Sequence, residues 1–532
     1  MLDGAVYTVN DSLPRAQAVA VSDGEIVFVG NNAEAEEYIA DNTEVIELQG
    51  KMLLPGFIDS HNHVFEGVFS VGNECDLSPD DTLAGQIPWL EECKSRNPEP
   101  GKWITGYGHQ FETLMNNDEN TNPRRLLDTI FPENPVVLME ESSHSMIANS
   151  MALELAGFDR ESDHPIGGRL MRGSDGELNG VLFDNAGDII MEMAWNSRKS
   201  LFENNYQGLL GGMDEVSRNG ITTVGDGRLY WQRGWYDVWQ AARENGDLTI
   251  RASLRPWIYP DVDMETQFQF LGDVATKGID DLLILNQAKL YSDGIIHFGT
   301  ARLLTPYGFS WQKNLPLGLN YIAPGPLIKW LERLEEVNLG AHIHALGDRG
   351  VREALDAIEV VRSRGSEQLY SLTHLEMIDE QDIPRFSQLD VDADFQAGAD
   401  FFEYTDWATD YIGIDRARRM FPMRDVYDSG ANVTFSSDWT VNPLNPLVAI
   451  ARSVKLKKSK GLPSVHEAIK AATINGAIAL GLHSITGSIE VGKSADFAVL
   501  EKDITRLSWR KIRKTPILMT ILEGDIVYDA TD

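Results

Sequence analysis

The pair His61 and His63 is the first feature of this sequence that could do chemistry. It closely follows an apolar run at residues 53–59. On an extended strand, side chains two positions apart point to the same side, so both imidazoles can bind one metal ion. The spacing alone leaves an alternative open, because two exposed or hydrogen-bonded histidines would give the same pattern.

Further residues able to bind a metal stand at or near the ends of other strand-like runs. They are Lys289, His344, His374 and Asp438. In a barrel of parallel strands, the carboxyl ends of all strands lie at one face, and that face carries the active site. We therefore expect these side chains to converge with the two histidines.

The elements that would position them alternate between strand-like and helical segments, which is typical of a parallel α/β fold. Eight strand-like runs occur, at residues 53–59, 221–226, 250–256, 283–290, 341–345, 370–374, 391–396 and 433–437. Eight such runs predict a TIM (β/α)8 barrel. About 160 residues separate the first two runs, too many for a loop, so we expect an inserted subdomain at about residues 103–193, after the first barrel strand.

Both ends of the chain are rich in short strand-like runs. Residues 17–21 and 25–29 flank Ser22-Asp23-Gly24, a sequence typical of a hairpin turn. Residues 496–500, 517–522 and 526–528 show the same character near the other end. We predict one small β-sandwich domain built from residues 1–54 and 485–532, around a metal-dependent barrel domain at 55–484.

The charge and cysteine content narrow the class of protein. Asp and Glu number 81 against 46 Lys and Arg, a net charge of −35, which disfavours nucleic acid as a partner. The sequence contains no long apolar run and no signal-peptide pattern, so we expect no membrane association and a cytoplasmic location. Cys75 and Cys93 are the two cysteines. They could form a disulfide, but we expect two free thiols in a reducing compartment.

Several motifs resemble the amidohydrolase superfamily, and within it the YtcJ-like branch of metal-dependent hydrolases that includes N-substituted formamide deformylase. The matching stretches run in order along essentially the whole chain. They are residues 55–63, 143–150, 220–226, 288–294, 344–349, 436–439 and 487–496.

The resemblance implies a role for each metal-binding candidate. His61 and His63 would hold the more buried ion with Asp438, and His344 and His374 would hold the second. Lys289 would be carboxylated by CO2 and bridge two Zn²⁺ ions, because a carbamate offers two anionic oxygens whereas an ammonium group, with a pKa of about 10.4, is no ligand. The alternative is that Lys289 pairs with an acidic residue and that the site holds one ion. Manganese, iron or cobalt would also suit these ligands.

The implied activity is hydrolysis of a carbon–nitrogen bond other than a peptide bond, such as an N-formyl or N-acyl amide, in a small molecule. Metal-activated hydroxide would attack the carbonyl, with Asp438 as the catalytic base and then acid. Alternatives are a cyclic amidase, deaminase or esterase of the same superfamily, or a non-catalytic metal-binding or ligand-binding relative. The resemblance also leads us to expect a homodimer.

The residues that would contact substrate are less constrained by the sequence. His144 lies in the predicted insertion and would contact substrate or oxyanion, or else be a structural histidine on a buried turn. Tyr291, Arg349 and Trp439 stand close in sequence to proposed ligands, so each would line the pocket or pack behind it. His342 shares a strand face with His344, and we expect it to be a core histidine.

Overall fold

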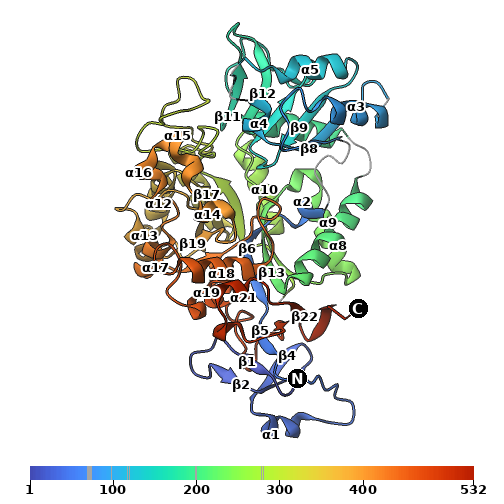
Figure 1. Cartoon of the computed structure of the whole chain (residues 1–532), viewed down its shortest axis with the longest axis vertical. Coiled ribbons are helices and arrows are strands. Elements are labelled where there is room, and N and C mark those ends of the chain that lie inside the picture. The colour runs from blue at the N-terminus through green and yellow to red at the C-terminus, as the bar shows by residue number, and fades with distance from the viewer. Residues whose placement is uncertain are drawn as a thin grey trace.

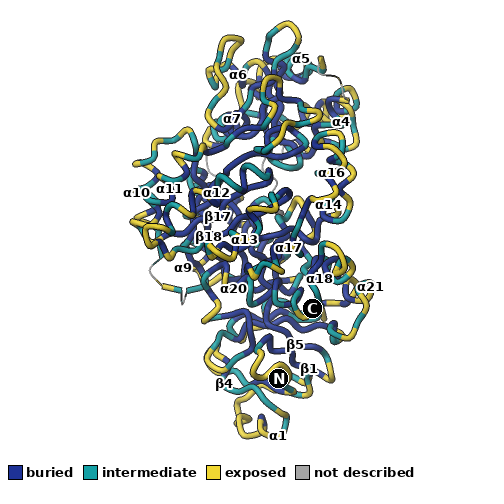
Figure 2. The backbone as a smooth tube through the Cα atoms, turned by 90° about the vertical axis from the view of Figure 1, so that its left-hand side faces the viewer, coloured by how far each residue is buried: buried dark blue, intermediate teal, exposed yellow. Residues whose placement is uncertain are grey.

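The computed structural model describes residues 1–531 except 69–74, 98, 117, 119, 198–200, 277 and 280. The molecule is elongated, as Figure 1 shows. A β-rich part with both termini forms one end, an α/β part the middle, and a sheet covered by helices the other end. Figure 2 shows that buried backbone is concentrated along the middle of the molecule.

The β-rich end combines strands from both ends of the chain. Its six-stranded sheet has the order β2-β1-β5-β21-β22-β23. The strands are β1 (Ala5–Tyr7), β2 (Arg15–Ala16), β5 (Met52–Pro55), β21 (Phe497–Leu500), β22 (Ile517–Leu522) and β23 (Asp525–Asp529). Val6, Leu53 and Phe497 pack in one small core, so the two ends bury each other's apolar side chains.

A hairpin of β3 (Ala18–Ser22) and β4 (Glu25–Gly30) lies beside this sheet. Its turn places Asp23 at φ 50° and Gly24 at φ 80°. Two successive positive φ angles are what a tight hairpin turn requires, and they explain the preference for Asp-Gly. The hairpin prediction is confirmed.

Two sheets of parallel strands form the middle of the molecule, with the orders β15-β14-β13-β6 and β16-β17-β18-β19-β20. The strands are β6 (Phe57–Asn62), β13 (Ile221–Leu229), β14 (Arg251–Pro256), β15 (Leu283–Ile284), β16 (Gln287–Tyr291), β17 (Gly340–Ala345), β18 (Tyr370–His374), β19 (Val391–Phe395) and β20 (Val433–Phe435). Backbone contacts join the two sheets, between the end of β14 and β16 and between β6 and the segment after β20. Trp257 pairs with Lys289, and the Asp438 amide donates to the His61 carbonyl at 2.9 Å.

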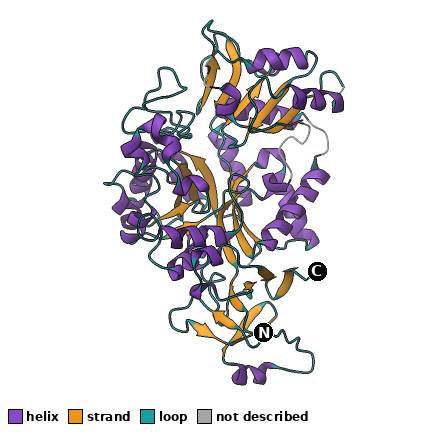
Figure 3. Ribbon diagram, viewed as in Figure 1, coloured by secondary structure: helices purple, strands orange, loops and turns teal. Residues whose placement is uncertain are grey.

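Helices surround these strands, as Figure 3 shows. The principal ones are α8 (Phe202–Arg218), α9 (Trp235–Asn245), α10 (Met264–Val274), α11 (Pro324–Glu336), α12 (Asp348–Arg362), α13 (Ile383–Gln388), α17 (Met423–Asp428), α18 (Pro446–Leu456), α19 (Val465–Ala471) and α20 (Ile474–Ala479). Their apolar faces cover strands that are buried along their whole length, which is typical of parallel sheets.

Two predicted strands are each divided in the structure. The run at 53–59 breaks at Gly56, so its first half, β5, joins the terminal sheet and its second half becomes β6. The run at 283–290 breaks where the Leu285 amide turns away to donate to Thr276 Oγ1 at 2.8 Å. A continuous apolar run reports burial, and it cannot show where the chain passes from one sheet to the next.

The inserted segment forms a six-stranded sheet of order β11-β12-β10-β9-β8-β7. Its strands are β7 (Cys75–Asp76), β8 (Ile104–His109), β9 (Val136–Glu140), β10 (Ser145–Ala148), β11 (Gly168–Arg172) and β12 (Leu178–Asp184). Helices α3 (Ile87–Arg96), α5 (Pro123–Ile130) and α7 (Asn185–Asn196) accompany them. Because β7 belongs to this sheet, the segment begins ahead of residue 103.

Cys75 on β7 and Cys93 on α3 form a disulfide, so the expectation of two free thiols was wrong. Their Cα atoms lie 5.1 Å apart, within the range that a disulfide needs, and both side chains are buried. The spacing of 18 residues gave no sign that this short strand and this helix pack together.

Among the described residues, no helix is both long and apolar enough to cross a membrane.

Gly56→Ala should lower the free energy of unfolding by about 1–3 kcal/mol, a cost typical of overpacking. A Cβ at this position would overlap the buried side chain of Thr222. Gly325→Ala is the matched control, because it adds a Cβ in open space near the start of α11. Urea unfolding of both variants measures the difference. If Gly56→Ala and Gly325→Ala have equal free energies of unfolding, the close packing at the junction between β5 and β6 is contradicted.

Protein purified without reductant and then unfolded should show no thiol that reacts with Ellman's reagent. After reduction it should show two thiols, because the chain has two cysteines and both are in the disulfide. Two reactive thiols before reduction would contradict the Cys75–Cys93 pairing.

Candidate metal centre

Strand β6 and the segment after β20 bring two histidines and a carboxylate together. Asp438 Oδ1 lies 2.9 Å from His63 Nε2 and 3.2 Å from His61 Nε2. The two imidazoles therefore face the same side, as their spacing predicts. Asp438 adopts φ 51°, a left-handed backbone conformation. Such conformations are uncommon outside glycine and often occur at functional sites.

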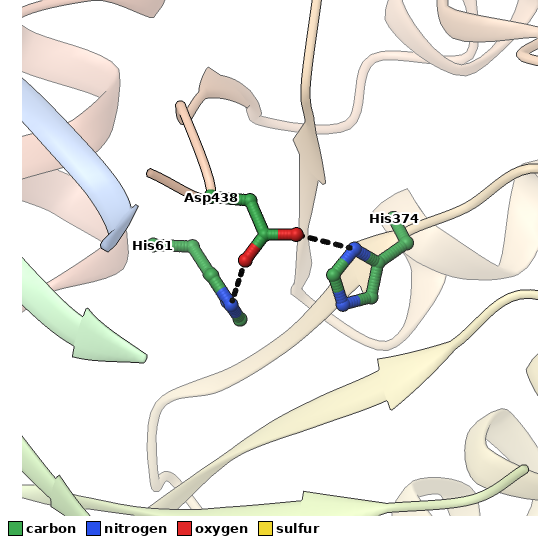
Figure 4. Close-up of side chains that lie close together, drawn as sticks. All are labelled: His61, His374 and Asp438. Atoms are coloured by element: carbon green, nitrogen blue, oxygen red, sulfur yellow. Dashed lines mark ion pairs between the residues drawn. The ribbon is translucent and has the colours of Figure 1, made fainter. Parts of the chain in front are cut away.

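His374 approaches the same carboxylate from the end of β18. Its Nδ1 lies 3.9 Å from Asp438 Oδ2 and 3.1 Å from Gln396 Oε1. Figure 4 shows Asp438 between His61 and His374. The ligand atoms of these three residues lie within 4.8 Å of one another, close enough to bind one ion.

His344, on β17, extends the cluster beyond His374. The centroids of these two rings are 4.5 Å apart. His344 Nδ1 and His63 Nδ1 are buried, and neither has a hydrogen-bond partner among the described residues. Buried polar atoms normally have partners, and a metal ion or a polar neighbour would satisfy these nitrogens. The donor set of imidazole nitrogens and carboxylate oxygens fits a divalent ion such as zinc.

Lys289 lies on β16 next to this cluster and is fully buried. Its Nζ is 3.4 Å from His61 Nδ1, and the ion pairs of the described residues include none that Lys289 forms. Burial lowers the pKa of Lys289 well below its ordinary value, although Asp438 opposes this shift. A lowered pKa favours the neutral amine, which is the form that reacts with CO2.

Burial also sets the charge of the other groups. It lowers the pKa of His61 and of His344 well below the ordinary value, and it lowers that of His374 to about 3. A neutral imidazole keeps the lone pair that binds a metal. Burial would raise the pKa of Asp438, but hydrogen bonds with His61 and His63 outweigh it and hold that pKa well below its usual range.

His342 is buried and packs beneath His61, as expected for a core histidine. Its Nε2 lies 2.7 Å from His61 Nδ1, and its Nδ1 lies 2.6 Å from Ser371 Oγ. His61, His342 and Asp394 also place ligand atoms close together. The oxygens of Asp394, however, already accept hydrogen bonds from the hydroxyls of Thr373, Thr434 and Ser436. His342 therefore orients the His61 ring, as partners of metal-binding histidines do.

A polar cavity opens beside the histidine cluster. It is lined by the cluster itself and by Glu66, Ser142, Ser143, His144, Arg228, Tyr291, Thr440 and Val441. The inserted sheet contributes the stretch from Ser142 to His144, which connects β9 to β10. His144 Nδ1 lies 2.7 Å from Asp184 Oδ1, and its ring lies 5.0 Å from that of His344.

The four residues that the sequence analysis predicts to contact substrate fall into two groups. Tyr291 lines this cavity, as does His144. Arg349 and Trp439 are not among the residues that line it. Arg349 Nε donates to Glu353 Oε1 at 2.7 Å on α12, and the Trp439 carbonyl accepts from the His63 amide at 3.2 Å.

Glu66 and Arg228 line the cavity but are absent from the sequence prediction. Glu66 stands one helical turn beyond His63, with Oε2 3.9 Å from His63 Nδ1. Arg228 is near the end of β13. The position of Arg228 at a strand end was a usable signal, since that face of a parallel sheet carries functional residues.

The chain is similar in sequence and in fold to known proteins. The sequence profile described as Amidohydrolase family matches residues 44–528. The N-substituted formamide deformylase of Arthrobacter pascens is 26% identical over 100% of this chain and 98% of its own length. The putative amidohydrolase YtcJ of Bacillus subtilis is 28% identical over 99% and 98%. An uncharacterized metal-dependent hydrolase from Pyrococcus horikoshii has a similar fold, with a TM-score of 0.73 at 21% identity over 96% and 98%.

Lys289→Ala, expressed with zinc and bicarbonate, should retain about one fewer metal ion per chain than the native protein. The reason is that only a carboxylated Lys289 can supply two bridging oxygens. Elemental analysis of the purified proteins measures the content. Lys460→Ala is the control, because that lysine lies away from the histidine cluster. If Lys289→Ala keeps the metal content of the native protein, the prediction that Lys289 is carboxylated and binds metal is wrong.

Proposed function

This chain belongs to the amidohydrolase family, and from that premise we propose that it hydrolyses an amide-type carbon–nitrogen bond, N-formyl or N-acyl, in a small molecule. The observation that carries the proposal is the convergence of His61, His63, His374 and Asp438 beside a polar cavity, with Lys289 buried next to them.

We assign the metal ligands as follows. His61, His63 and Asp438 would hold one ion, His344 and His374 would hold the second, and Lys289, once carboxylated, would be a ligand shared by both. Two zinc ions suit the nitrogen and oxygen donors. When bound, the metal activates water as a nucleophile and polarises the carbonyl of the substrate.

The protein's own groups handle the proton. Asp438, held as a carboxylate by His61 and His63, accepts a proton from the attacking water and passes it to the leaving nitrogen. Gln396 Oε1 orients His374 by accepting a hydrogen bond from its Nδ1 at 3.1 Å, and His342 orients His61. These contacts keep the reacting groups in one arrangement, which is the main contribution of a preorganised site.

The architecture proposed for this function is a (β/α)8 barrel at residues 55–484 that carries the site at the carboxyl ends of its strands. Residues 1–54 and 485–532 would form the separate β domain. The inserted sheet would close one side of the cavity through Ser142, Ser143 and His144.

Two observations support a small acyl group. The relative described as N-substituted formamide deformylase aligns with this chain along its whole length. Among the described residues that line the cavity, Val441 is the single aliphatic side chain, so the cavity suits a polar amide with little hydrocarbon on its carbonyl side.

The test is a substrate panel on zinc-loaded protein: 4-nitroformanilide and 4-nitroacetanilide as linear amides, hydantoin, adenosine and 4-nitrophenyl acetate. We expect cleavage of the linear amides, with the formyl compound preferred. Turnover of hydantoin, adenosine or the ester alone would instead identify a cyclic amidase, deaminase or esterase. Metal binding without any turnover would identify a non-catalytic relative.

Asp438→Asn should lower kcat by about 10²–10⁴-fold, since it removes a proton acceptor. It should lower metal content less, because an amide oxygen remains a weak ligand. Asp410→Asn, at an exposed position on α15 (Thr409–Ile412), is the control. Loss of metal in parallel with loss of activity would show that Asp438 acts as a ligand alone.

A further inference from the structure

The hydroxyl of Tyr291 has a hydrogen that no described group accepts. Arg228 Nη1 donates to Tyr291 Oη at 3.0 Å, so the phenolic oxygen is the acceptor in that bond. The hydrogen bonds of the described residues include none that this hydroxyl donates. A buried hydroxyl normally uses its hydrogen, so this one is available to a ligand.

The Tyr291 ring is fixed beside the histidine cluster. It stacks on His344, with centroids 4.4 Å apart and an interplanar angle of 14°. Tyr291 follows Lys289 by two positions on β16, so both side chains lie on one face of that strand. Both Tyr291 and Arg228 line the cavity that contains His374 and Asp438.

The charges around this hydroxyl keep it a donor. A tyrosine hydroxyl has an ordinary pKa of about 10, so a phenol is a hydrogen-bond donor at neutral pH. Arg228 is buried, and Glu66 Oε1 lies 3.5 Å from its Nε, so the guanidinium charge is compensated. A hydrogen bond from a cation to the phenolic oxygen makes the O–H group a stronger donor, because linked hydrogen bonds polarise one another.

We propose that Tyr291 is a catalytic residue whose hydroxyl donates to the substrate carbonyl oxygen as that oxygen becomes negative, and that Arg228 is the positioning residue that holds and polarises this hydroxyl. The inference rests on the proposed amide hydrolysis and adds a protein donor to it. Donors aimed at an oxygen that gains charge are among the largest single contributions to catalysis.

Hydrolysis of the amide by this route needs water and no other reactant. A water oxygen forms a bond to the carbonyl carbon, its proton passes to Asp438, and the C=O π electrons move to the oxygen that Tyr291 contacts. Collapse restores the C=O bond and breaks the C–N bond. The nitrogen leaves with the proton from Asp438, and Tyr291 keeps its own proton throughout.

Tyr291→Phe removes this hydroxyl and keeps the ring on His344. On 4-nitroformanilide we expect kcat to fall about 10²-fold, with KM and metal content nearly unchanged, as for loss of one oxyanion donor. Tyr259→Phe is the matched control. Tyr259 is an equally buried tyrosine, packed 4.4 Å from Trp257 between ring centroids, and it does not line the cavity.

Arg228→Lys tests the positioning role while retaining a positive charge beside Glu66. In the native background it should lower kcat about 10-fold, because a lysine cannot reproduce the guanidinium hydrogen bond. In the Tyr291→Phe background it should cost little more, since it acts through the missing hydroxyl. Equal losses in the two backgrounds would show that Arg228 does not act through Tyr291.

Methylphosphonate binding to the zinc-loaded protein separates this inference from the proposed function. This tetrahedral anion should bind about 10-fold more weakly to Tyr291→Phe than to the native protein or to Tyr259→Phe. If the native protein cleaves no amide yet shows this difference, the proposed substrate is wrong and the donor site stands. Equal methylphosphonate affinity in Tyr291→Phe and native protein overturns the inference, whatever the amide assay shows.

Discussion

Removal of ionisable groups from water is the constraint on which this structure depends. His61 and Lys289 are almost completely buried beside the carboxylate of Asp438. A buried charge without compensation is costly, so burial lowers the pKa of His61 and of Lys289, while hydrogen bonds hold the pKa of Asp438 below its usual range. The result is that imidazole nitrogens surround one carboxylate. This arrangement contributes little to the stability of the fold and much to the binding of a cation.

The register of neighbouring strands, and not closeness in sequence, brings these residues together. The pairing of β16 with β17 places Lys289 opposite His342, and that of β17 with β18 places Ala345 opposite His374. Residues that are tens of positions apart in the sequence therefore meet at one level of adjacent strands. His374 and Asp438 then take positive φ angles, which direct their side chains toward the histidines as the strands end.

Sequence patterns were sufficient for the features that depend on local periodicity or on a motif. The positions of the parallel strands, the Asp23-Gly24 hairpin and the family of the chain all follow from them. Features that depend on packing between distant segments could not be predicted. The Cys75–Cys93 disulfide, the break at Gly56 and the approach of Arg228 to Tyr291 are of this kind. Arg349 and Trp439 are not among the residues that line the cavity, because nearness in sequence to a ligand does not decide on which side of a strand end a side chain falls.

The terminal sheet links the last part of the chain to the strand that carries the histidine pair. Strand β5 lies between β1 and β21, and it continues through Gly56 directly into β6. During synthesis, β5 emerges early but has an open edge until β21 is made. The segment that holds His61 and His63 thus gains its final support from β21, which is synthesised much later than β5. Assembly of the histidine cluster is therefore tied to synthesis of β21, and a chain that ends before β21 would lack an anchored first strand.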